Sequence, residues 1–347
     1  MKPVKPYDCV VFIGRFQPVH NAHVAILRRA YELADKVVVV VGSANQPRTV
    51  DNPFNVSERM NLVRQAFDRI APPEHLNVVA VEDNMYNNTA WAVTVQQAVS
   101  TCIYGDVAII GHKKDETSFY LDMFPQWAFV EQEEVEPLHA ASVREQYFSR
   151  HANLNFLTGV VPATTLNFLE RFQKTDDYAN IVEEKEFNDK YKKQFENYPF
   201  PPTFVTSDAV VIQSGHVLMV KRRHRPGKGL LAFPGGFLNA GTDRSMEDCM
   251  IRELYEETKL KVPEPVVRGS IVEVKVFDGI KRSARGRTIT HAFKIVFRDG
   301  EWALPKVKGS DDADPVGTGW YPISKVTREM CFEDHYSILQ YFLGKGN

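Results

Sequence analysis

The sequence predicts two α/β domains in one chain, the first built on a parallel sheet and the second on a mixed, mostly antiparallel sheet. Apolar runs alternate with helical patterns through the first half, and this alternation implies parallel strands joined by right-handed crossovers. From residue 203 onward the pattern turns to short strands with only two convincing helices. A length of 347 residues also exceeds what one typical core occupies, which favours two domains.

The composition is that of a globular protein and gives no general affinity for a polyanion. The chain is 44% hydrophobic and 25% charged, and its net charge of -2 does not attract nucleic acid or an anionic membrane. No run reaches the roughly 18 apolar residues needed to span a bilayer, and the N-terminus shows no signal-peptide pattern. The cysteines lack paired spacing, which favours buried thiols over disulfides or a metal framework. We therefore expect a cytoplasmic protein without nucleic-acid or membrane partners.

Five strands are expected in the first half, with helices between them. The strands cover residues 9–13, 36–41, 77–81, 106–110 and 127–130, and the helices cover residues 20–35, 56–70 and 89–101. The first strand is apolar throughout, as a strand buried on both faces should be. Because ligands of parallel sheets gather at the carboxyl ends of the strands, we expect the chemistry in the loops that follow residues 13, 41, 81 and 110.

The loop after the first strand, GRFQPVHNAH, begins at Gly14 and ends in the first turn of a helix. Unpaired N–H groups and the helix dipole make such a turn a binding site for anions. His20 and His23 are three residues apart, so they share one face of the turn and can reach the same phosphate. Arg15 and Gln17 add hydrogen-bond donors. The alternative is a pair of ordinary surface histidines, which this combination of residues disfavours.

The loops after the second and third strands add further candidates. Arg48 offers several donors to the oxygens of a triphosphate. Asp83 can accept a hydrogen bond from an amide or a ribose hydroxyl, and Trp91 offers a face on which a planar ring can stack. Packing in the core explains Trp91 equally well.

Two more segments carry potential phosphate ligands. Gly111 permits a tight turn after the fourth strand, and His112 and Lys113, with Lys114, gather at the mouth of that strand. Ser142 and Arg144 stand at the start of a helix, where a helix N-terminus and a guanidinium occur together.

The first half resembles the archaeal-type nicotinamide mononucleotide (NMN) adenylyltransferases. GRFQPVHNAH is similar to the HxGH signature of nucleotidyltransferases in its GRxQPxHxxH form, with Ala22 in place of Gly. Ser142-Val143-Arg144 is similar to the second signature of the family, and GSANQPRTVDNPF also matches. The resemblance covers about residues 8 to 172 and implies a Rossmann-like nucleotidyltransferase domain. It further implies that Arg48 binds the phosphates of ATP and that Asp83 and Trp91 bind the nicotinamide.

A charged stretch from Thr175 to Pro199 separates the two halves. Its apolar residues form a loose helical stripe, and three prolines at 199, 201 and 202 end it. We therefore expect a first domain over residues 1–175, a linker helix and Pro-rich connection over residues 176–202, and a second domain over residues 203–347.

The second half is expected to place an acidic helix after a glycine loop. Its strands cover residues 203–212, 216–221, 266–277 and 288–297, and its helices cover residues 245–258 and 331–343. Glu253, Glu256 and Glu257 are spaced i, i+3 and i+4, so their carboxylates share one face and repel one another. A hard cation such as Mg²⁺ removes that conflict. A solvated acidic face is the alternative, and the preceding Gly235-Gly236 disfavours it.

This segment resembles the Nudix box, which implies a mixed α/β Nudix domain. The match is strong at Gly236 and over Arg252–Glu257, but the interval between them contains two extra residues. The first Glu of the box lacks a clear counterpart among residues 242–244, and Lys259 stands where the family has Gly. A later loop, GSDDADPVGTGWYPIS, is similar to an Asp-rich loop of many Nudix hydrolases, in which Asp311 or Asp312 could position metal or water.

The order of the two domains resembles the bacterial bifunctional NMN adenylyltransferase/ADP-ribose pyrophosphatases. The resemblance implies two reactions, both assisted by Mg²⁺ or Mn²⁺: synthesis of NAD and pyrophosphate from NMN and ATP, and hydrolysis of ADP-ribose to AMP and ribose 5-phosphate. It assigns His20, His23, Arg48 and Arg144 to the triphosphate, and Glu253, Glu256 and Glu257 to the metal of the second domain.

Alternatives from other classes remain at this point. The first domain could transfer AMP to another phosphate, such as phosphopantetheine, and the second could sense ADP-ribose or NAD without hydrolysing it. A homo-oligomer is compatible with the sequence. The general base of hydrolysis and the choice between NMN and nicotinic acid mononucleotide are left open.

Overall fold

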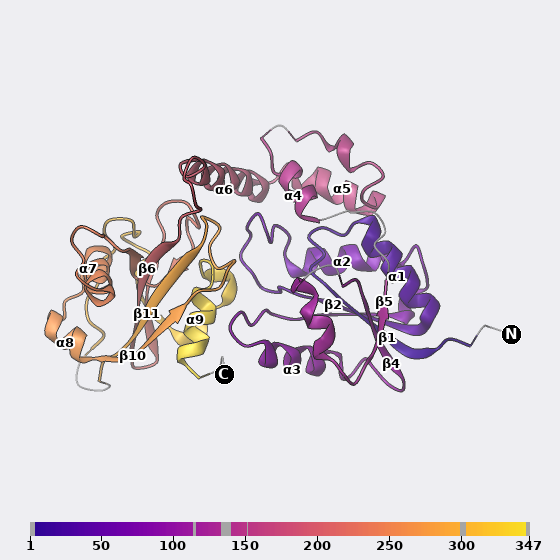
Figure 1. The fold of residues 1–347 in the computed structure, drawn as a ribbon, viewed down its shortest axis with the longest axis horizontal. Helices are drawn as coiled ribbons and strands as arrows, with labels where there is room; N and C mark the ends of the chain where they lie inside the picture. Colours follow the sequence, from indigo (N-terminus) through magenta and orange to yellow (C-terminus); the bar gives the residue numbers. More distant parts are fainter. Residues whose placement is uncertain (1–3, 114–115, 133–139, 151, 299–302, 345–347) are drawn as a thin grey trace. The chain divides into compact units, whose positions relative to one another are not determined.

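The computed structural model describes residues 4–113, 116–132, 140–150, 152–298 and 303–344 (Figure 1). The chain divides into two compact units, Met1–Glu183 and Glu184–Asn347. The division falls inside one helix, α6 (Asp176–Lys193), so its first turns belong to the first unit and the rest to the second. The linker expected over residues 176–202 contains this point. No helix in the described ranges is long and apolar enough to cross a membrane.

The first unit is built on a sheet of five parallel strands in the order β3-β2-β1-β4-β5. Its strands are β1 (Tyr7–Gly14), β2 (Ala34–Val41), β3 (Leu76–Ala80), β4 (Val107–Gly111) and β5 (Ala128–Glu131). The helices between them are α1 (Asn21–Leu33), α2 (Val56–Phe67) and α3 (Asn88–Val99). The predicted parallel α/β fold is therefore confirmed.

The continuous apolar runs of β1 and β2 fill both faces of this sheet. Val10 and Phe12 belong to the core beneath α1 and α2, whereas Val11 and Ile13 belong to the core beneath α3. The five valines from 37 to 41 alternate between the two cores in the same way. Burial on both faces requires this sequence pattern and places the polar loops at the strand ends.

Two boundaries in the first unit differ from expectation. The helix predicted over residues 20–35 ends at Leu33, and β2 starts at Ala34 without a loop. The helix predicted over residues 56–70 ends at Phe67. In both cases apolar residues of the following segment extend the helical pattern, so periodicity alone did not locate the end.

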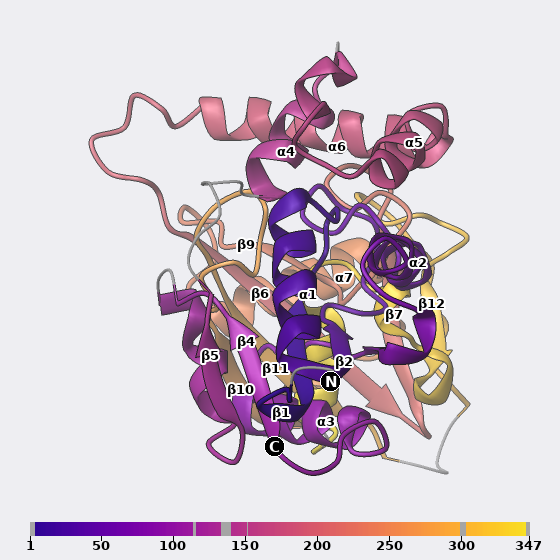
Figure 2. The same ribbon diagram turned by 90° about the vertical axis from the view of Figure 1, so that its right-hand side faces the viewer.

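A helical layer that the pattern indicated only in part completes the unit. The helices α4 (Ala140–Tyr147), α5 (Ala163–Phe172) and the first turns of α6 share one core with Phe54 (Figure 2). Phe54 packs edge-on against Phe168 and Phe172, with centroid distances of 5.1 Å to each. The loop after β2 is thus anchored to a helical layer far along the chain.

The second unit has a mixed sheet in which β10-β11-β6-β7-β12 run side by side, with β8 paired to β7 and β9 to β6. The strands are β6 (Phe204–Gln213), β7 (His216–Lys221), β8 (Leu231–Ala232), β9 (Gly235–Phe237), β10 (Ile271–Phe277), β11 (Thr288–Val296) and β12 (Gly319–Pro322). Among the described strands of this unit, only β6 and β11 form a parallel pair. The helices are α7 (Met246–Thr258), α8 (Glu264–Gly269) and α9 (His335–Phe342). The predicted mixed α/β domain is confirmed.

Two segments of this unit contradict the sequence-based expectation. The strand predicted from residue 266 begins only at Ile271, because Val266 and Val267 lie in α8, where Val267 is buried and Val266 is exposed. The helix predicted from residue 331 begins at His335, because Glu333 has a left-handed backbone with φ of 46°. Such a conformation interrupts a right-handed helix.

Candidate active sites

The loop predicted to bind phosphate starts where β1 meets β2. The carbonyl of Gly14 accepts a hydrogen bond from Gly42 N–H at 2.9 Å, which holds the ends of the two strands side by side. The amide of Gln17 donates to the Phe54 carbonyl and accepts from Phe54 N–H, both at 3.0 Å. Gln17 is 1% exposed. We therefore assign its side chain to support of the loop, which corrects the expectation of a donor to substrate.

His20 and His23 come together at the start of α1. His20 is the N-cap residue, and its backbone N–H donates to Nδ1 of His23 at 3.2 Å. The two rings stack with centroids 3.6 Å apart, and Phe16 packs against His23 at 4.8 Å. The pair therefore presents two imidazoles at one helix N-terminus, as the spacing indicated. Its contact with a phosphate stays a prediction.

The surroundings of His23 fix its charge and tautomer. Burial lowers the pKa of His23 well below its usual range, and the neighbouring His20 lowers it further. His23 is therefore neutral at neutral pH. Because Nδ1 accepts the hydrogen bond from His20, we assign the proton to Nε2. His23 thus offers one N–H donor without a positive charge.

Two guanidinium groups lie beside this loop. Arg144 on α4 is buried, and it donates to the Gln17 carbonyl at 3.0 Å and to Asp51 at 3.2 Å. Burial lowers the pKa of Arg144, and the positive charge of Arg15 lowers it further. Arg15 donates to Asn52 at 3.0 Å. The two cations are thus close enough to repel each other, which favours an anion between them. Ser142 is exposed in the first turn of the same helix.

Arg48, predicted to bind the triphosphate, is paired with two carboxylates. Its two terminal nitrogens contact the two oxygens of Glu58 at 2.8 and 2.9 Å, and its Nε contacts Asp177 at 2.8 Å. Glu58 also accepts from Asn55 N–H and so caps α2. Arg48 therefore joins the loop after β2 to α2 and α6 in this structure. Its contact with a phosphate stays a prediction.

Arg59 is a buried arginine that supports these loops and that the sequence motifs do not single out. Its guanidinium is 1% exposed and donates to the carbonyls of Arg15, Gly42 and Ser43 at 2.8, 2.6 and 2.9 Å. Burial lowers its pKa to about 10. Arg59 therefore ties the loops after β1 and β2 together. The signal was an arginine at an inward position of the helical pattern, between Val56 and Val63.

Two predicted site residues, Asp83 and Trp91, follow β3. Asp83 accepts from Ser43 N–H at 3.2 Å, which joins the loops after β3 and β2. Trp91 is half-buried and packs edge-on against Tyr120 and Phe124, with centroids at 6.2 and 6.1 Å. Core packing and partial exposure are thus both present at Trp91.

The residues after β4 form a separate group. A side chain at Gly111 would approach Leu121 to 2.8 Å, so glycine there permits close packing. A ring nitrogen of His112 lies 3.2 Å from the Gln132 carbonyl, and the exposed Lys113 pairs with Asp122. Lys114 lies outside the described residues.

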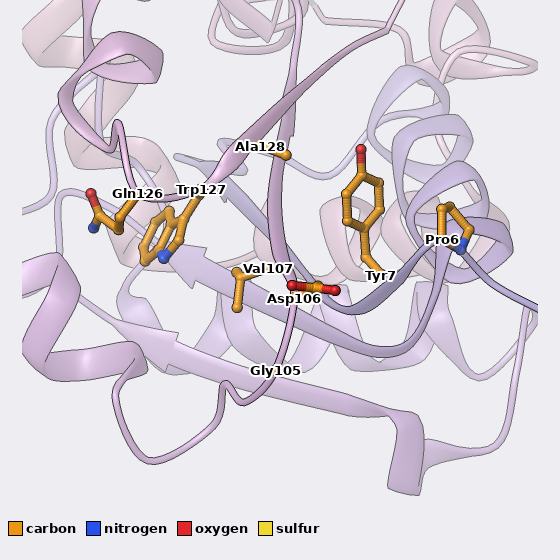
Figure 3. A pocket seen from close by; sticks show the side chains of 8 residues that line it. All are labelled: Pro6, Tyr7, Gly105, Asp106, Val107, Gln126, Trp127 and Ala128. Carbon is orange, nitrogen blue, oxygen red and sulfur yellow. The ribbon is translucent and has the colours of Figure 1, made fainter.

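A cavity of about 410 Å³ lies on the opposite edge of the same sheet (Figure 3). Its lining includes Tyr7, Val107 and Ala128, the first residues of β1, β4 and β5. The histidines and arginines lie at the carboxyl ends of the strands. Ligands of parallel sheets bind at that edge, so we do not assign this cavity to the reaction.

In the second unit, two glycines let the acidic helix approach the sheet. Gly235 and Gly236 pair with Asp208 and Ser207 of β6. Gly235 N–H donates to Glu257 at 2.9 Å. A Cβ on Gly236 would lie 2.5 Å from the carboxylate of Glu253. The absence of side chains at both positions is therefore what brings α7 carboxylates against the backbone of β9.

Arg252 offsets part of the repulsion that the sequence predicts among the three glutamates. It contacts Glu253 at 2.7 Å and Glu256 at 3.0 Å, so two of the three carboxylates are paired. It also binds Asp243 at 2.8 Å, and this bond lowers the pKa of Asp243 to about 2. Asp243 is thus an acidic partner of Arg252. The two extra residues in the box prevent its recognition from a fixed spacing.

Glu257 is the buried glutamate of the three, and Glu253 is the nearer of the other two to the backbone of β9. Burial raises the pKa of Glu257 to about 8, and the charge of Glu253 adds to that increase. Burial likewise raises the pKa of Glu253; its bond to Arg252 opposes this increase, and the charges of Glu256 and Asp311 add to it. Asp312 lies 4.0 Å from His224 instead.

The donors fit a hard divalent cation. Among the described residues, no group of three or more His, Cys, Asp or Glu side chains is arranged to hold a metal ion. Glu253 and Glu257 nevertheless supply only oxygen donors, which Mg²⁺ and Mn²⁺ prefer. A cation would also favour their ionised forms. Glu256, paired with Arg252, would have to turn to join them.

Lys259 gives a stability prediction at the end of α7. It is the C-cap residue with φ of 47° and ψ of 35°, a left-handed conformation that costs an L-residue more than glycine. We expect Lys259→Gly to raise the free energy of unfolding by about 1 kcal/mol in urea titrations. Lys261→Gly, at a position without positive φ, should lower it slightly. Equal losses in both variants would contradict the assignment.

Comparison with known proteins identifies a family for each of the two units. Residues 11–146 match the cytidylyltransferase-like family, and residues 203–342 match the NUDIX domain. A nicotinamide/nicotinic acid mononucleotide adenylyltransferase from Acinetobacter baylyi is 34% identical over 193 residues, which cover 54% of this chain and 95% of that protein.

Two solved structures from Francisella tularensis match nearly the whole chain. A bifunctional NMN adenylyltransferase/ADP ribose pyrophosphatase is 31% identical with a TM-score of 0.91, over 98% of this chain and 100% of the other. The second structure, complexed with AMP and a Mn ion, is 30% identical with a TM-score of 0.88 over the same shares.

Proposed function

The chain belongs to the family of bifunctional NMN adenylyltransferases/ADP-ribose pyrophosphatases, and on that basis we propose that it carries out both reactions. The first unit transfers AMP from ATP to NMN, which gives NAD and pyrophosphate. The second unit hydrolyses ADP-ribose to AMP and ribose 5-phosphate. The observation that carries the proposal is the likeness to a bifunctional enzyme over 98% of the chain, a length that includes both candidate sites.

In the first reaction, the chain's residues position and neutralise phosphates. An oxygen of the NMN phosphate bonds to the α-phosphorus of ATP, while the bond from that phosphorus to the leaving pyrophosphate breaks. The phosphate is already a nucleophile, so no side-chain base is needed. We assign the Nε2–H of His23, together with His20, to the ATP phosphates. Arg15 and Arg144 supply positive charge beside them.

Arg48 has a different part in this proposal. Its bonds to Glu58 and Asp177 fix the loop that carries Asp51, the partner of Arg144. We therefore assign Arg48 to positioning that loop, and its contact with the triphosphate stays a prediction. Contacts of substrate with the remaining candidates stay predictions: Gly14, Asp83, Trp91, Gly111, His112, Lys113, Ser142, Gly235 and Gly236.

In the second reaction, Glu253 and Glu257 would hold a divalent cation against β9. Nucleotidyltransferases and Nudix enzymes use divalent metals, and we propose Mg²⁺ or Mn²⁺ for both units. When bound, such an ion acts as a Lewis acid and lowers the pKa of a water ligand. Gly235 N–H orients the carboxylate of Glu257, and Asp243 keeps Arg252 anchored beside Glu253. The general base stays open.

Product analysis of the purified full chain tests both halves separately. With ATP, NMN and Mg²⁺ we expect NAD and pyrophosphate, and with ADP-ribose and Mg²⁺ we expect AMP and ribose 5-phosphate. Nicotinic acid mononucleotide and phosphopantetheine serve as alternative acceptors. Transfer to phosphopantetheine alone would overturn the first half, and binding of ADP-ribose without cleavage would replace the second half by a sensor.

Trp91 tests the choice of acceptor. If the nicotinamide ring stacks on its exposed part, the contact is worth about 1 kcal/mol. Trp91→Ala should then raise the KM for NMN roughly fivefold and leave the KM for ATP unchanged. Trp91→Phe keeps an aromatic ring, so its KM for NMN should lie between those of wild type and Trp91→Ala. An equal rise for both substrates would indicate that Trp91 acts only through its packing on Tyr120 and Phe124.

A further inference from the structure

The edge strand β10 of the second unit has one side that no other described strand covers. It pairs with β11 on one side, and it stands at the end of the strand order (Figure 1). In the part of the chain that the structure describes, no strand pairs with its other side. An edge strand presents unpaired N–H and C=O groups, which form a template for another strand unless something blocks it.

The side chains of β10 are unusual for an edge left in water. All five residues from 272 to 276 are exposed. Val274 and Val276 point to one face with exposed fractions of 48% and 43%, and Val272, which lies at the irregularity in the pairing, is 60% exposed. The strand contains no proline, and its described pairing shows an irregularity only at its start. Exposed β-branched residues at alternate positions of an edge strand favour a partner strand over solvent.

The charges of β10 identify the partner. Glu273 and Lys275 flank Val274 and point to the opposite face from the valines. In an antiparallel pair of identical strands centred on Val274, each Glu273 stands opposite the other copy's Lys275, and the two Val274 residues stand opposite each other. Every cross-strand pair in that register is then favourable. The sequence of this strand is complementary to itself.

We propose that two copies of the chain associate through β10, which pairs antiparallel with its counterpart about a twofold axis at Val274. The interface is isologous, as most homodimer interfaces are. It joins the two sheets into one and brings the valine rows of both copies together. Lys275 already lies with its Nζ 5.5 Å from the Tyr341 ring of α9, which limits its mobility before pairing. Neither Glu273 nor Lys275 belongs to the sites assigned above.

Charge reversal tests this register in the full chain. Lys275→Glu places two pairs of glutamates opposite each other, and Glu273→Lys places two pairs of lysines. Each variant alone should raise the dimer dissociation constant at least about tenfold in sedimentation velocity. The swapped variant Glu273→Lys/Lys275→Glu should dimerise like wild type. An equimolar mixture of the two single variants should form a heterodimer, because opposite charges then face each other.

The outcomes separate this interface from other kinds of association. Lys281→Glu, an exposed charge beyond the strand, is the matched control and should leave the mass unchanged. A wild-type monomer at all accessible concentrations would overturn the proposal. A dimer insensitive to the two single reversals would place the contact on another surface. Failure of the swapped variant and of the mixture to associate would exclude the antiparallel register centred on Val274.

Discussion

His23→Ala is expected to lower the kcat of NAD synthesis about 100- to 1,000-fold, with small changes in the KM for ATP and NMN. The neutral ring is held by Phe16, by His20 and by the bond from His20 N–H to Nδ1, so its Nε2–H is preorganised. Donors of this kind act mainly on charge that develops in the transition state. Hydrolysis of ADP-ribose by the second unit should remain at the wild-type rate.

Two matched substitutions separate the donor from the fold. His23→Asn keeps an acceptor near the position of Nδ1, and so the cap of α1, but lacks a donor at Nε2. His23→Gln places an amide nearer to Nε2 and should recover part of the activity. His20→Ala should also lose activity, whereas His75→Ala, at the amino end of β3, should not. If His23→Asn and His23→Ala keep the wild-type kcat, His23 has no part in the transfer.

The strands of the first unit could be predicted because burial on both faces requires apolar residues. A parallel strand covered on both faces has to be apolar at every position, and the runs at Cys9–Ile13 and Val37–Val41 have that property. The loops with functional residues then follow from the carboxyl-end rule. Short elements could not be predicted, because their contacts with other segments determine their structure more than their own sequence pattern does. The three residues of β9 form a strand by pairing with β6, and α8 has only six residues.

The site residues could be predicted by type but not by partner. Arg48 was recognised as a cation for phosphate, but its pairing with Asp177 depends on where α6 packs. Asp243 was hidden by the two extra residues of the box, which a fixed spacing cannot accommodate, although the chain brings it to Arg252. Arg252 itself lies on the acidic face, and the spacing of the glutamates does not show that it pairs with two of them. Long-range pairs of this kind require the tertiary structure.

Glu257→Gln is expected to lower ADP-ribose hydrolysis by at least about 100-fold and to leave NAD synthesis unchanged. Loss of a residue that only supports a metal ligand costs about 10- to 100-fold, and a ligand costs more. The amide oxygen of Gln can still accept from Gly235 N–H, so the change removes charge rather than the contact with β9. Glu247→Gln, in the first turn of the same helix and paired with Arg268, is the control and should stay active.

The same substitution has a distinct signature in the stability of the metal-free protein. The pKa of Glu257 is about 8 in the folded chain and about 4.3 in an unfolded chain. Between these values the folded state binds the extra proton, so this group stabilises the fold at low pH and its contribution is lost as pH rises toward 8. Glu257→Gln should therefore match wild type near pH 4.5 and exceed it in thermal stability near pH 8.5. Added Mg²⁺ should stabilise wild type there and the variant much less.

These two measurements distinguish a metal site from a structural carboxylate. If Glu257 served only to hold β9 through Gly235, its replacement would lower stability at every pH and would reduce hydrolysis only in proportion. If it binds the cation, hydrolysis falls while the metal-free protein gains stability at high pH. Full hydrolysis by Glu257→Gln would remove it from the metal site, because burial and the charge of Glu253 make its ionised form costly unless a cation compensates it.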